Sequence, residues 1–89
     1  MDVIKFANGA VYDCPHLATL PKVDDGIAYV GISGVDYATA ARIFSDESMT
    51  REMEWGNYRL VGYTRLRYVM VEPYGFKACL EGGHDELIE

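Results

Sequence analysis

Only one stretch of the chain has the apolar spacing of an amphipathic helix. Tyr37, Ala40, Ala41 and Phe44 fall at positions i, i+3, i+4 and i+7, which places them on one helical stripe. Residues 33–36 (Ser-Gly-Val-Asp) come just before it, with the Ser-x-x-Asp spacing of a capping box. One short helix cannot enclose a core, so the rest of the chain must supply a sheet for it to pack on.

The first two strands are predicted as a hairpin around the Asn-Gly pair at residues 8–9. This pair suits the positive φ angles of a two-residue turn. In the register that such a turn sets, Ile4 is opposite Asp13 and Phe6 is opposite Val11. We therefore expect Ile4, Phe6 and Val11 to share the face that enters the core.

Five more strands are predicted. Residues 27–32 form a nearly continuous apolar run, which is typical of a central strand buried on both faces. The other four follow the helix, with a turn at residues 65–67, and span residues 50–55, 58–64, 68–72 and 76–81. The predicted fold class is α+β: a mostly antiparallel β-sheet with one packed α-helix, in the order β-β-β-α-β-β-β-β.

The length of 89 residues fits one domain, which we assign to residues 1–83. Gly82 and Gly83 are expected to release a short acidic tail, residues 84–89. A domain of this size buries only about 60% of its unfolded surface, so an additional cross-link would stabilise it substantially.

The formal net charge is −6, from 8 basic and 14 acidic residues. Nucleic acids and anionic membranes are bound by basic surfaces, so we expect this chain to bind neither directly. A basic protein surface is the expected partner. No apolar run approaches the roughly 20 residues of a membrane span, and residues 1–5 do not resemble a secretory signal, so a cytoplasmic location is expected.

All the cysteines and histidines fall into two short pairs near the two ends of the chain. Cys14 and His16 form a Cys-x-His pair, and Cys79 and His84 form a Cys-x4-His pair. Together they would supply the four thiolate and imidazole ligands of a tetrahedral, structural zinc site. The alternatives are unligated thiols, a disulfide or an incomplete site. If His84 is not a ligand, the fourth ligand would be a carboxylate oxygen of Asp85, Asp13 or Glu81.

Motifs that indicate catalysis are absent from the sequence. It contains no G-x-S-x-G, Walker loop or H-E-x-x-H pattern. The glycines at residues 31 and 34 are explained by a turn into the helix. A catalytic dyad of Cys14 and His16 would lack an evident third group to orient the histidine. We therefore expect a protein that is not an enzyme.

Acidic residues occur in short groups that are candidates for docking on a basic partner. Complementary charge would speed the encounter, while exposed aromatic side chains would supply much of the affinity. The alternative is a solvated surface that keeps a small protein soluble. The candidate partner-binding residues are Asp24, Asp25, Asp46, Glu47, Glu52 and Glu54.

Three segments give the chain a resemblance to small bacteriophage and prophage accessory proteins. They are residues 4–9 (Ile-Lys-Phe-Ala-Asn-Gly), 43–46 (Ile-Phe-Ser-Asp) and 71–77 (Val-Glu-Pro-Tyr-Gly-Phe-Lys). A compact, acidic chain with a potential zinc site is also similar to the anti-CRISPR proteins that inhibit type II RNA-guided nucleases. This resemblance implies stoichiometric inhibition in the host bacterial cytoplasm, by blocking a basic nucleic-acid channel of the nuclease. The alternatives are a virion structural or assembly protein and, ranked last, a small metal-dependent enzyme.

Overall fold

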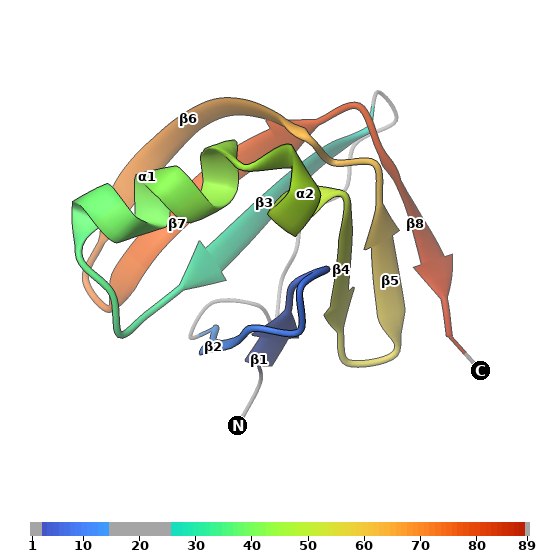
Figure 1. Cartoon of the computed structure of the whole chain (residues 1–89), viewed down its shortest axis with the longest axis horizontal. Coiled ribbons are helices and arrows are strands. Elements are labelled where there is room, and N and C mark those ends of the chain that lie inside the picture. The colour runs from blue at the N-terminus through green and yellow to red at the C-terminus, as the bar shows by residue number, and fades with distance from the viewer. Residues whose placement is uncertain (1–2, 15–25, 89) are drawn as a thin grey trace.

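The computed structural model describes residues 3–14 and 26–88, which form two antiparallel sheets and two helices (Figure 1). The sheet orders are β2-β1-β4-β5-β8 and β3-β7-β6, which confirms the α+β class. The elements are β1 (Val3–Lys5), β2 (Val11–Asp13), β3 (Ile27–Ile32), α1 (Tyr37–Ser45), α2 (Glu47–Thr50), β4 (Glu52–Trp55), β5 (Tyr58–Val61), β6 (Arg65–Glu72), β7 (Gly75–Glu81) and β8 (His84–Leu87).

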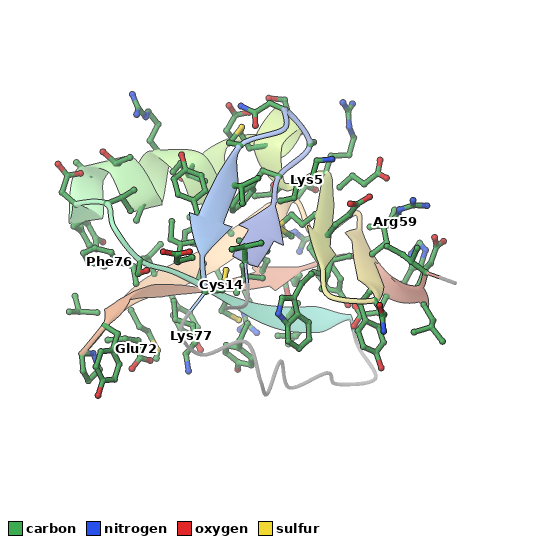
Figure 2. All side chains as sticks on the ribbon, turned by 90° about the horizontal axis from the view of Figure 1, so that it is seen from below. Lys5, Cys14, Arg59, Glu72, Phe76 and Lys77 are labelled. Carbon is green, nitrogen blue, oxygen red and sulfur yellow. The ribbon has the colours of Figure 1, made fainter. Side chains whose placement is uncertain are left out.

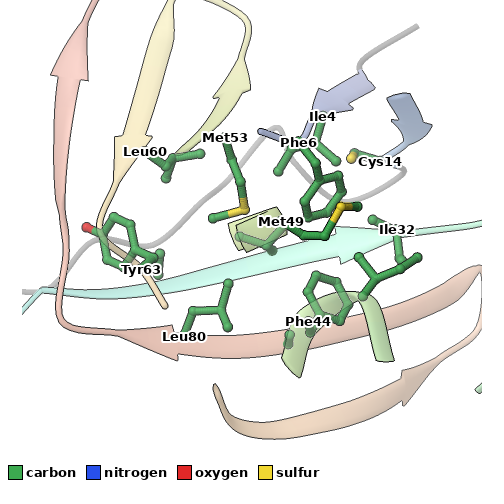
Figure 3. Packing of buried hydrophobic residues seen from close by; sticks show 14 of the residues in the cluster. Ile4, Phe6, Cys14, Ile32, Phe44, Met49, Met53, Leu60, Tyr63 and Leu80 are labelled. Atoms are coloured by element: carbon green, nitrogen blue, oxygen red, sulfur yellow. The ribbon is translucent and has the colours of Figure 1, made fainter. Parts of the chain in front are cut away.

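The core lies where the inner faces of the two sheets meet α1 and α2. Figure 3 shows Phe6 of the first hairpin between Ile4, Met49 and Phe44, with Leu80 of β7 to the left of Phe44. All five side chains are at most 8% exposed. Truncating a buried phenylalanine such as Phe44 to alanine costs about 3–5 kcal/mol, so this junction holds the two sheets together.

Helix α1 is where the sequence pattern predicts it, but its cap and its buried stripe differ slightly. The side chain of Asp36, rather than that of Ser33, is the N-cap, and it accepts a hydrogen bond from Thr39 N at 2.7 Å. The buried residues are Ala40, Ile43 and Phe44, so the stripe is rotated toward Ile43.

The predicted register of the first hairpin is wrong by one residue. Ile4 pairs with Tyr12, because the turn contains the three residues 7–9 instead of two. Gly9 takes a φ of +90°, as a three-residue hairpin turn requires. A shift of one residue moves a side chain to the other face, so Val11 is 56% exposed instead of buried.

Three other predictions about elements are corrected. β3 is at one end of its sheet rather than central. Its residues alternate between half-buried and buried over residues 27–30, and residues 30–32 are all buried. Residues 65–67 begin β6, with an irregularity in pairing between Leu66 and Tyr68, instead of forming a turn. The short helix α2 separates α1 from β4 because Asp46 caps it, accepting hydrogen bonds from Ser48 N and Oγ.

The predicted acidic tail is instead strand β8, which pairs with β5 along its whole length. Gly83 brings the chain back to the sheet, because a Cβ there would overlap the carbonyl oxygen of Val61 and lie 2.6 Å from Tyr63 N. The structured domain thus extends past residue 83. No helix within the described residues is long and apolar enough to cross a membrane.

Candidate acidic docking surface

Charged side chains alternate in sign across four strands on the outer face of the five-stranded sheet. The antiparallel register places Lys5 of β1 opposite Glu54 of β4, Glu54 opposite Arg59 of β5, and Arg59 opposite Glu86 of β8. Directly opposed residues lie on the same face of a sheet, so these four side chains form one row. Figure 2 labels Lys5 and Arg59, which lie on either side of Glu54 in this row.

Arg59 is surrounded by three carboxylates. Its Nε is 3.1 Å from Glu52 Oε1, its Nη2 is 3.8 Å from Glu54 Oε1, and its Nη1 is 4.0 Å from Glu86 Oε2. We call these four residues the Arg59 cluster. One guanidinium neutralises one of the three carboxylates, so the cluster carries an excess negative charge on a half-exposed surface. Exposed ion pairs such as these contribute little to stability. The three carboxylates therefore remain available to bind a cationic side chain of a partner protein.

A depression lies beside the Arg59 cluster, where the chain leaves the end of β1 next to β4. It has a volume of about 160 Å³ and is lined by Lys5, Phe6, Ala7, Glu52 and Glu54. A cavity of about 150 Å³ accepts one benzene-sized group, so the depression has room for the end of one side chain. The carboxylates of Glu52 and Glu54 outnumber the single ammonium group of Lys5 in this lining, which favours a basic side chain there.

The other acidic candidates lie elsewhere. Asp46 is at the junction of α1 and α2, where its hydrogen bonds with Ser48 lower the pKa of its carboxyl, so Asp46 is ionised at neutral pH. Glu47 is exposed in the first turn of α2. Asp24 and Asp25 lie outside the described residues.

The predicted zinc ligands are found in different environments. Cys14 belongs to the hydrophobic core on the inner side of the sheets (Figure 3). Cys79 is also buried, but it alternates with the core residues Ala78 and Leu80 and so points to the outer face of the three-stranded sheet.

The fourth-ligand candidate His84 is exposed on β8, where its Nε2 is 3.0 Å from Glu86 Oε1. His16 lies outside the described residues. Within residues 3–14 and 26–88, no cluster of three or more His, Cys, Asp or Glu side chains is placed to hold a metal. The zinc site therefore stays a prediction.

The aromatic residues divide into buried and exposed groups that the sequence alone does not separate. Tyr63 is 2% exposed, while Trp55 and Tyr58 are half-buried and stack with ring centroids 6.2 Å apart. The exposed rings are those of Tyr37, Tyr68 and Tyr74, which belong to α1, β6 and the turn after β6.

Sequence reasoning missed the role of Arg59. The strands predicted at residues 50–55 and 58–64 contained the necessary signal, because a two-residue connection between them places Arg59 opposite Glu54. Comparison with known family models, curated proteins and solved structures gave no match.

Proposed function

We propose that this protein is a non-enzymatic phage protein that binds and inhibits a host RNA-guided nuclease of type II. It would cover a basic surface on which the nuclease holds its guide or target. The observation that carries the proposal is the Arg59 cluster, in which three carboxylates surround one guanidinium on a partly exposed sheet face. The net charge of −6 adds long-range attraction to a basic partner.

The geometry suggests how docking would work. Arg59 keeps the carboxylates of Glu52 and Glu54 close together on one face before the partner arrives. A lysine or arginine of the nuclease would enter the adjacent depression and take over these carboxylates from Arg59. Such a cation would then no longer be available to a nucleic-acid phosphate.

The experiment is a comparison of two variants with the same change in net charge. Glu52→Gln/Glu54→Gln removes two charges from the Arg59 cluster, whereas Glu47→Gln/Glu81→Gln removes one charge from α2 and one from the three-stranded sheet. Binding to the immobilised nuclease is measured at low and at moderate salt. We expect the first variant to associate at least about tenfold more slowly and with a weaker salt dependence than the second. Equal losses in the two variants would contradict a specific docking face.

A second candidate function is a structural or assembly protein of the virion. It is favoured by the exposed apolar side chains on β6, which suit assembly into a larger particle. Mass spectrometry of purified virions distinguishes the two functions, because an inhibitor of the host nuclease would not remain with the particles in stoichiometric amounts.

A further inference from the structure

Strand β6 is the longest strand and lies at one end of its sheet. One edge of β6 pairs with β7, and no strand among residues 3–14 and 26–88 pairs with the other edge. The strand also carries exposed apolar residues: Tyr68 is 42%, Met70 36% and Val71 74% exposed. A long, apolar edge strand is a template for pairing with a further strand.

The charges along β6 are opposite at its two ends. Arg65 and Arg67, near its beginning, share the carboxylate of Glu81, at 3.1 Å and 3.9 Å. Glu72, at its end, is 3.3 Å from Lys77 Nζ. Figure 2 shows Glu72 and Lys77 on the side of the three-stranded sheet opposite α1.

We propose that two copies of this chain associate through antiparallel pairing of their β6 strands, forming one continuous six-stranded sheet. With the pair centred on Val69, Tyr68 lies beside Met70 of the second copy and Arg67 lies beside Val71. The irregularity between Leu66 and Tyr68 brings Arg65 onto the same face as Glu72, so Arg65 of one copy lies beside Glu72 of the other. Because a twofold axis relates the two copies, each of these contacts occurs twice in the dimer. Parallel pairing would instead place arginine against arginine, so the charge pattern selects a second copy in the antiparallel direction.

This inference is independent of the proposed function, because the Arg59 cluster belongs to the other sheet. A dimer paired through β6 would leave the outer face of the five-stranded sheet accessible on each copy. It would present two acidic surfaces, related by a twofold axis, to a partner. Loss of nuclease binding would not affect the dimer prediction, and a monomeric protein would not affect the docking prediction.

The first test is the molar mass in solution, measured by light scattering over a range of concentrations. The wild-type chain should approach twice the monomer mass as its concentration rises. Val71→Lys adds a positive charge beside the arginines of the second copy and should weaken association by at least about tenfold. Leu87→Lys is the matched control, because Leu87 is 61% exposed on β8, an edge strand of the other sheet.

The second test is exchange of the charged ends. Glu72→Arg alone and Arg65→Glu/Arg67→Glu alone should each shift the protein toward monomer, and the combination of all three substitutions should restore the dimer. Circular dichroism confirms that each variant is folded. The proposal is overturned if the wild type stays monomeric at the highest accessible concentration. A dimer that Leu87→Lys disrupts and Val71→Lys does not would also overturn it.

Discussion

The hydroxyl of Tyr63 donates a hydrogen bond to Asp85 Oδ1 at a distance of 2.6 Å. Tyr63 is buried just before β6, where the chain passes from one sheet to the other, and Asp85 is in the middle of β8. This bond joins the passage between the sheets to the last strand. It places β8 within the folded domain, although its residues are mostly polar.

Removing the hydroxyl should destabilise the domain. Tyr63→Phe keeps the buried ring but removes the hydrogen bond that Tyr63 donates to Asp85, so we expect the free energy of unfolding to fall by about 1–2 kcal/mol. Chemical denaturation measures the change. Asp85→Asn is the matched control: it keeps an oxygen acceptor for Tyr63 and should cost less. If Tyr63→Phe unfolds at the same denaturant concentration as the wild type, the hydrogen bond makes no net contribution to stability.

The same contact predicts how stability depends on alkaline pH. Burial, together with the hydrogen bond to Asp85, raises the pKa of Tyr63 well above its ordinary value. The folded state therefore binds the phenolic proton more tightly than the unfolded state, for which the pKa is about 10. The stabilisation is complete below about pH 10 and is lost as the pH rises through the folded-state pKa. Tyr63→Phe should show a shallower loss of stability above pH 10; a parallel loss would contradict this assignment.

Gly83 gives a test of how closely the chain approaches β5 before it enters β8. A Cβ at this position overlaps backbone atoms of residues 61–63, so Gly83→Ala should destabilise the domain by about 1–3 kcal/mol. Gly9→Ala is the control, because Gly9 has a φ of +90° and open space around its Cα. Its cost is conformational only, about 1–2 kcal/mol. A melting temperature that Gly83→Ala leaves unchanged would mean that residues 84–87 are not held against the sheet.

Local patterns in the sequence predict the fold class and α1, but not the details of pairing. The apolar spacing before Phe44 is sufficient for a helix, because a periodic stripe depends on neighbouring residues only. The turn after Phe6 depends on whether Ala7 joins the loop, and this choice reverses the face of every residue in β2. Composition also fails to predict β8. Its residues are mostly polar, and the strand forms because they pair with β5.

The candidate site was only partly predictable, for a related reason. Glu52 and Glu54 were selected for their charge alone, and the sequence does not reveal that Arg59 and Glu86 complete the same surface. Glu86 joins the cluster only because β8 pairs with β5. Since residues 84–89 were predicted to be a tail, Glu86 was not among the predicted site residues. For Cys14 and Cys79 the reverse holds. The sequence suggests that they bind one metal ion, but the fold places them on two different faces.

Zinc content tests the predicted metal site directly. The protein is purified without a histidine tag and its bound zinc is measured by elemental analysis. One zinc per chain, lost in Cys79→Ser, is the result that the ligand set Cys14, His16, Cys79 and His84 predicts. Such a site would add stability that a chelator removes. Less than about a tenth of an equivalent, with an unchanged melting temperature in chelator, would reject the prediction.

The inhibition stoichiometry tests the central claim most directly. A purified type II RNA-guided nuclease is incubated with increasing amounts of this protein, then guide and target are added, and the initial rate of target cleavage is measured. We predict that the rate falls in proportion to the protein added, that it approaches zero near one chain per nuclease binding site, and that a complex is isolated on gel filtration. Unchanged cleavage at a large molar excess with no complex, or full inhibition by far fewer chains than nuclease molecules, would contradict the account.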